Sequence, residues 1–118
     1  MNERLSEGEA KVMEILWERG SLSAKEISEI AAERTGWSKN TTYTVLTRLA
    51  GKGLIIRQDP GFFCRAAVSR EEMQKREASS LLERVFGGSR KALFSALLED
   101  EKLSAEEITE LRELIENR

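Results

Sequence analysis

The sequence WSKNTTYTVLTRLAGKG, at positions 37–53, has the pattern of an amphipathic helix with an unusual polar face. Helical spacing brings together an apolar stripe made of Thr42, Val45, Leu46 and Leu49. The opposite face carries cations, hydroxyls, one amide and one aromatic ring, but no carboxylate. Its members are Lys39, Asn40, Thr41, Tyr43, Thr44, Thr47, Arg48 and Lys52. Because DNA phosphates repel carboxylates and accept hydrogen bonds from such groups, as base edges also do, we predict a DNA-recognition helix.

The beginning of this helix supports the same prediction. Ser38 is a good N-cap, yet Lys39 follows it in the first turn, where a cation is mildly unfavourable beside the positive end of the helix dipole. An external anion such as phosphate would offset that cost. Four other predicted helices begin instead with capping boxes, which are Ser6/Glu9, Ser23/Glu26, Ser69/Glu72 and Ser104/Glu107. The alternative is an ordinary solvated helix face rich in Thr.

The distribution of charge along the chain is more informative than its total. The 118 residues carry a formal net charge of −2. Residues 36–65 contain five cations and a single anion, Asp59, which gives this segment a net charge of +4. A local basic face on an otherwise acidic protein is an electrostatic footprint of nucleic-acid binding.

The residue types exclude several classes of site. With one Cys and no His, a single chain cannot build a Cys/His zinc site, a disulfide framework or a His-dependent catalytic centre. We therefore expect no metal, no cofactor and no enzyme activity. The first residues, MNERLSEGEA, lack an apolar signal core, and no apolar run approaches the ~20 residues needed to span a membrane. These features predict a cytoplasmic protein without direct membrane insertion.

The residues on either side of the recognition helix predict a winged helix-turn-helix. One helix should run from about Ser6 to Arg19, and a second from the Ser23 cap to Thr35-Gly36, with Ser21-Leu22 extended between them. The expected inward stripe of the first helix consists of Ala10, Val12, Met13, Leu16 and Trp17. The fold class is therefore mainly α with a small β-hairpin wing.

The wing itself follows Gly53. Residues 54–58 and 62–66 read as strands, and Asp59-Pro60-Gly61 between them reads as a tight turn. Arg57 and Arg65 flank the hairpin. We consider two roles for them, phosphate contact and a solvated charge on an exposed strand face. Cys64 is interpreted as a small buried hydrophobe, and Trp37 as core packing at the helix entrance.

Three amphipathic helices are predicted after the wing, so we divide the chain into a DNA-binding domain, 1–68, and a helical dimerisation region, 69–118. The helices span about 70–86, the segment around Leu93, and the segment after Ser104. They have little to pack against within one chain, and dimerisation solves that problem. The alternative is that they fold back on their own domain. The expected interface residues are Leu81, Leu82, Val85, Leu93, Leu97, Ile108, Leu111, Leu114 and Ile115.

Several motifs in order across nearly the whole chain resemble the penicillinase and methicillin-resistance repressors (BlaI/MecI), which are grouped with the copper-responsive CopY repressors. The matching segments are Leu5-Ser6-x-x-Glu9, Val12-Met13, Leu16-Trp17, Trp37-Ser38-x-x-Thr41, Thr44 with Arg48-Leu49, Lys52-Gly53, Leu98-Glu99-Asp100 and Leu103-Ser104. The resemblance implies an N-terminal winged helix and a helical dimerisation region. It also implies a homodimeric repressor that occupies a double-stranded DNA operator with two-fold symmetry.

The sequence departs from these relatives in two places. Copper-responsive members carry a Cys-rich tail, whereas this sequence ends Ile115-Glu116-Asn117-Arg118, so the resemblance does not imply copper sensing. In the β-lactam branch, a membrane-bound sensor protease triggers cleavage of the repressor at an Asn-Phe bond. The matching positions here are Ala96 and Leu97, which are the candidate cleavage site that the resemblance implies.

Two other classes of function remain open at the level of sequence. A winged helix used for protein contacts would carry carboxylates on its recognition face and would lack the basic segment. A ligand-responsive repressor of another winged-helix family would need an apolar effector cavity. An enzyme is disfavoured because no catalytic constellation is visible.

Overall fold

The computed structural model describes residues 4–99 and 102–117, so Asp100 of the Leu98-Glu99-Asp100 motif lies outside the described residues. The chain forms two compact units, Met1–Ala78 and Ser79–Arg118, which are described separately below. The described elements, in chain order, are α1 (Glu7–Arg19), β1 (Leu22–Ser23), α2 (Ala24–Thr35), α3 (Lys39–Gly51), β2 (Ile55–Gln58), β3 (Phe63–Ala66), α4 (Arg70–Arg84), α5 (Arg90–Leu98) and α6 (Ala105–Glu116). The predicted mainly α fold with a hairpin wing is confirmed.

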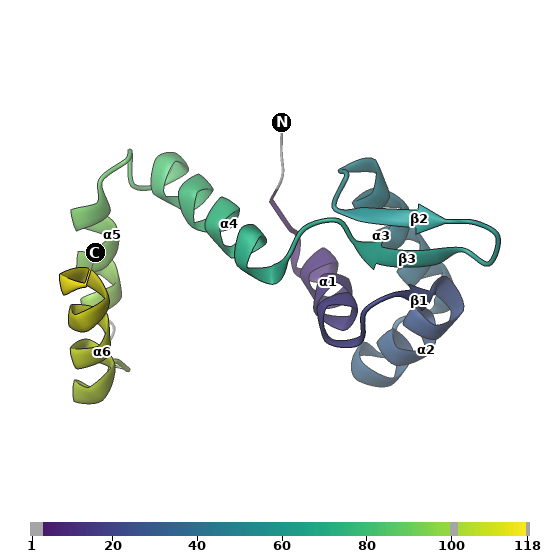
Figure 1. Ribbon diagram of the computed structural model, residues 1–118, viewed down its shortest axis with the longest axis horizontal. Coiled ribbons are helices and arrows are strands. Elements are labelled where there is room, and N and C mark those ends of the chain that lie inside the picture. The colour runs from purple at the N-terminus through teal and green to yellow at the C-terminus, as the bar shows by residue number, and fades with distance from the viewer. Residues whose placement is uncertain (1–3, 100–101, 118) are drawn as a thin grey trace. The chain divides into compact units, whose positions relative to one another are not determined.

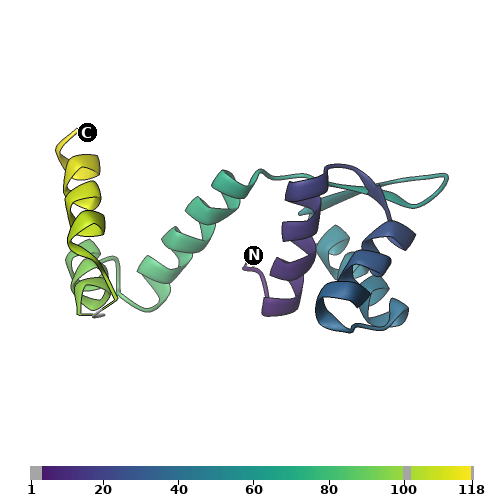
Figure 2. The same ribbon diagram turned by 90° about the horizontal axis from the view of Figure 1, so that it is seen from below.

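The first unit packs three helices against a small antiparallel sheet. The strand order is β1-β3-β2, so the predicted hairpin is joined by a short third strand, in which Leu22 pairs with Cys64. Figure 1 shows the three strands side by side, and Figure 2 shows α1, α2 and α3 together on one side of them. Placing the helices on one face leaves the other face of the sheet to solvent, as antiparallel sheets commonly do.

Local hydrogen bonds explain where the helices begin and end. Both bonds of the capping box are present at the starts of α1, α2 and α6. At α3, the Ser38 side chain accepts from the Thr41 backbone N–H at 3.2 Å. Helix α2 ends because Gly36 adopts a left-handed conformation (φ 77°), which lets its N–H donate to the Ala32 carbonyl at 2.9 Å. The short Gly-containing connection then leads directly into α3.

The core of the first unit differs from the prediction at one position of α1. Val12, Met13 and Leu16 are buried as predicted, but Ala10 is exposed and Ile15 is buried in its place. The reason is that Glu9, for which the sequence predicts only a capping role, is itself fully buried and belongs to the inward face. The buried face of α1 therefore includes Glu9 and does not include Ala10.

The second unit consists of helices without a core of their own. Its α5 is capped by Ser89, whose side chain accepts from the Ala92 backbone N–H at 3.0 Å, a cap that the sequence analysis does not predict. Among the described residues from 79 onward, none is buried. Five described large apolar side chains of this unit are half exposed or more, which are Val85, Leu97, Leu98, Leu114 and Ile115. A helical unit that buries none of these residues lacks its main source of stability as a single chain.

Candidate nucleic-acid interface

Helix α3 separates its two faces as the sequence predicted. Its inward stripe, Thr42, Val45, Leu46 and Leu49, is buried against the core. The exposed face carries Lys39, Asn40, Thr41, Thr44, Thr47 and Arg48, and Tyr43 lies partly buried at its edge. Because the buried stripe fixes the rotation of the helix, these polar side chains all face solvent together. Helix α3 thus presents a continuous surface that contains no carboxylate.

Hydrogen bonds within α3 determine what its threonines offer to a ligand. The Thr44 hydroxyl donates to the Asn40 carbonyl at 2.9 Å, and the Thr47 hydroxyl donates to the Tyr43 carbonyl at 3.0 Å. Each hydroxyl proton is therefore already used within the helix. The oxygen lone pairs and the methyl groups remain free, which suits contacts to donor groups and to thymine methyls on base edges.

The first turn of α3 carries a cation and no acid. Lys39 places its ammonium nitrogen 5.5 Å from the centre of the Tyr43 ring, within the range of a cation–π contact. This contact partly offsets the unfavourable position of Lys39 beside the positive helix end, while leaving the side chain exposed.

The two arginines of the wing lie on opposite faces of the sheet. In the β2–β3 register, Arg57 pairs with buried Cys64, whereas Arg65 pairs with exposed Ile56. Because cross-strand partners share a face, Arg57 is on the side of the helices and Arg65 is on the opposite, solvent side. The structure therefore brings only Arg57 toward α3. Sequence alone missed this difference because it depends on strand register.

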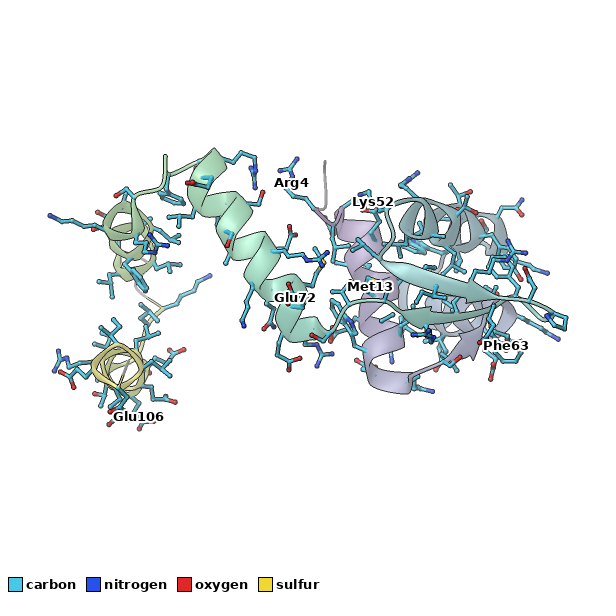
Figure 3. All side chains as sticks on the ribbon, turned by 45° about the horizontal axis from the view of Figure 1, so that its top comes forward. Arg4, Met13, Lys52, Phe63, Glu72 and Glu106 are labelled. Atoms are coloured by element: carbon cyan, nitrogen blue, oxygen red, sulfur yellow. The ribbon has the colours of Figure 1, made fainter. Side chains whose placement is uncertain are left out.

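Lys52 has an intramolecular partner that the sequence did not reveal. Its ammonium nitrogen lies 2.7 Å from Oε1 of buried Glu9 and donates to the Arg4 carbonyl at 2.9 Å. Figure 3 shows Lys52 and Arg4 near the first turn of α1. We predicted a phosphate contact for Lys52 from its place on the polar face. As the C-cap of α3, however, it extends toward the start of α1, and its side chain is only 23% exposed.

The Glu9 carboxyl is held in its charged form by this arrangement. Burial raises the pKa of Glu9, but hydrogen bonds from the Lys52 ammonium and the Ser6 backbone N–H, together with the charge of Lys52, outweigh it. The pKa of Glu9 therefore lies below its usual value. No local sequence signal predicts the contact, because 43 positions separate the two residues.

The predicted dimerisation residues lie on exposed or partly exposed surfaces of the described second unit and of α4. Leu82, Leu93 and Leu111 are partly buried, and the most exposed are Val85, Leu97, Leu114 and Ile115. Helices α5 and α6 also form an open groove of about 380 Å³, lined by Phe94, Leu98, Ile108, Leu111, Arg112, Ile115 and Glu116. The candidate cleavage bond, Ala96–Leu97, lies within α5, where helical hydrogen bonding holds the backbone away from the extended form that proteases bind.

Within residues 4–99 and 102–117, no group of three or more His, Cys, Asp or Glu is placed to hold a metal ion. No helix in those same ranges has the length and apolar character needed to cross a membrane.

Comparison with known proteins gives one consistent family. The family model for the penicillinase repressor matches residues 5–117. The penicillinase repressor of Bacillus licheniformis is 28% identical over 96% of this chain and 90% of its own length. The methicillin resistance regulatory protein MecI of Staphylococcus aureus is 30% identical over 97% of this chain and 94% of its own length.

A solved structure agrees with this result. The solution structure of the DNA-binding domain of the repressor BlaI has a TM-score of 0.55 and 25% sequence identity. The match covers 58% of this chain and 87% of that domain. The chain described here belongs to the penicillinase repressor family, a family of DNA-binding transcriptional repressors and not of enzymes.

Proposed function

We propose that this chain is a homodimeric repressor that binds an operator with two-fold symmetry, placing one copy of α3 in the major groove of each half-site. The observation that carries the proposal is the exposed, carboxylate-free face of α3 on a rigidly buried stripe. A recognition helix needs both features, because phosphates and base edges accept hydrogen bonds and the helix must be held in a fixed orientation.

Distinct parts of this face have distinct proposed roles. Asn40, Thr41, Tyr43, Thr44 and Thr47 are proposed to lie nearest the base edges. Lys39, Arg48 and Arg57 are the proposed phosphate contacts on the same side. Arg65, on the opposite face of the sheet, can reach only a phosphate beside the outer surface of the wing. Lys52 is proposed to stabilise the fold through Glu9, because its charge is already paired.

The proposed homodimer rests on the second unit. Val85, Leu97, Leu114 and Ile115 are half exposed or more, and none of the described residues from 79 onward is buried, so the second unit gains stability when a second copy covers these side chains. Two copies would also present two α3 helices, which matches the two half-sites of a symmetric operator. Phosphate contacts then double, and so does the number of counterions released.

Arg48→Ala tests the proposed function most simply. The variant should weaken binding to all DNA sequences to a similar degree and lower the slope of log affinity against log salt by about one unit per half-site contact. The measurement is fluorescence anisotropy between about 50 and 200 mM salt, on a duplex selected from a random pool by the wild-type protein. Arg19→Ala is the matched control, because Arg19 also lies in the last turn of a helix but outside the α3 face. Equal slopes for wild type and Arg48→Ala would contradict the proposal.

A further inference from the structure

Phe62 is the residue at which the wing, α2 and α3 meet. Its carbonyl accepts a hydrogen bond from the backbone N–H of Ala24, the first residue of α2, at 2.9 Å. Its ring makes an edge-to-face contact with Tyr43 of α3, with the ring centres 5.5 Å apart and the planes at 85°. The guanidinium carbon of Arg57, on β2, lies 3.6 Å from the centre of the same ring. One side chain therefore contacts both the proposed base-reading helix and the proposed phosphate contact of the wing.

The backbone at Phe62 is held in an uncommon conformation. Its φ of 49° lies in the left-handed region, which bulky residues rarely adopt, and no other described residue except glycine has a positive φ. A residue keeps such a conformation only where surrounding contacts hold it in place. Residues of this kind are frequent at functional sites. At Phe62, the hydrogen bond from Ala24 and the ring contact with Tyr43 hold the backbone in this conformation.

The ion pair between Arg57 and Asp59 is long and exposed to solvent. The Nε–Oδ1 distance is 3.4 Å, and both side chains are about half exposed or more, so solvent screens the pair. The ring contact places the guanidinium carbon over the face of Phe62, 3.6 Å from the ring centre. A phosphate can therefore compete with Asp59 for Arg57 while the ring keeps the guanidinium in place.

We infer that Phe62 is a positioning residue for DNA binding, which holds the Arg57 guanidinium in a fixed relation to Tyr43 of α3. The inference rests on the proposed function, since it assumes that α3 and Arg57 contact the same duplex. Without the ring, Arg57 keeps its charge but loses its preferred orientation. DNA binding must then order the Arg57 side chain, and the entropy cost of this ordering lowers the affinity for DNA. Phe62 then acts on affinity through Arg57 and not by contact with DNA.

A double-mutant cycle separates this role from simple packing. Phe62→Leu keeps apolar volume but removes the ring, whereas Phe62→Tyr keeps the ring. DNA affinity and its salt slope are measured for both variants in the wild-type and Arg57→Ala backgrounds, with the homodimer and its selected duplex. We expect Phe62→Leu to lower affinity several-fold and to give a salt slope between those of the wild type and Arg57→Ala, because Arg57 keeps its charge. In the Arg57→Ala background it should change the slope no further, and Phe62→Tyr should restore wild-type binding.

The outcomes that overturn the inference are distinct from those that overturn the proposed function. If Phe62→Leu lowers affinity equally in both backgrounds, Phe62 acts by packing alone and the inference is wrong. If Arg48→Ala, measured in the same series, leaves the salt slope unchanged, the proposed function itself fails. Thermal unfolding shows whether each variant is folded. If Phe62→Leu is not, Phe62→Met replaces it in the same cycle, because the flexible Met side chain can adapt to the space that the ring leaves.

Discussion

Leu114→Asp should convert the proposed dimer into monomers and lower the affinity for an operator with two half-sites by about 10²–10⁴-fold. Leu114 is 67% exposed in the single chain, so an aspartate there costs the isolated fold little. In an interface, the same aspartate would bury an unpaired charge at a cost of several kcal/mol. Sedimentation velocity at micromolar concentration measures the first effect, and an anisotropy titration measures the second. Leu111, which is partly buried within its own chain, would be a less decisive position.

Thr109→Asp is the control for this experiment. It introduces the same charge on the same helix, at an exposed polar position outside the apolar stripe. We expect Thr109→Asp to remain dimeric and to bind DNA as the wild type does. A wild-type protein that is wholly monomeric at micromolar concentration, or a Leu114→Asp variant that is as dimeric as Thr109→Asp, would show that this surface is not the interface.

Lys52→Ala should reduce the free energy of unfolding by about 3–5 kcal/mol, because it leaves the buried carboxylate of Glu9 without its cation. Urea unfolding measures this loss. The double variant Glu9→Gln with Lys52→Met removes both charges and should recover much of the stability, since no unpaired charge remains. Where Lys52→Ala remains folded, its DNA salt slope should match that of the wild type. A lowered slope with unchanged stability would restore Lys52 as a phosphate contact.

The same pair makes a prediction about pH. The folded-state pKa of Glu9 is lowered, so the unfolded chain binds the proton more readily than the folded one. The contribution of Glu9 is therefore complete above its unfolded pKa of about 4.3 and is lost as pH falls through the lower folded pKa. In Lys52→Ala, the hydrogen bond and the charge through which Lys52 lowers the pKa of Glu9 are removed, so this acid loss should become smaller. Parallel stability profiles for the two proteins below about pH 5 would contradict the assigned pairing.

Local patterns in the sequence predicted the elements of this fold because each depends on near neighbours. Ser and Glu three positions apart specified the capping boxes, and helical spacing specified the buried stripe of α3. The exposed polar face of α3 followed from that stripe. A helix-turn-helix followed by a β-hairpin is the order of elements in a winged helix, so this order predicted the fold.

The features that sequence missed depend on contacts between distant residues or on register. Glu9 and Lys52 meet only after α1 and α3 pack, and the buried residues of α1 include both Glu9 and Ile15. The opposite orientations of Arg57 and Arg65 depend on the β2–β3 register. The positive φ of Phe62 could not be expected either, because a phenylalanine carries no preference for it.

Titration of the wild-type protein on duplexes with different half-site spacing tests the proposed repressor most directly. Two copies of the selected half-site, in inverted orientation, are placed about one helical turn apart and then separated by a further half turn or full turn. A homodimer that reads both sites through α3 should lose most of its affinity with the added half turn and regain part of it with the full turn. Equal affinity for every spacing, or for a duplex with a single half-site, would contradict binding as a symmetric dimer.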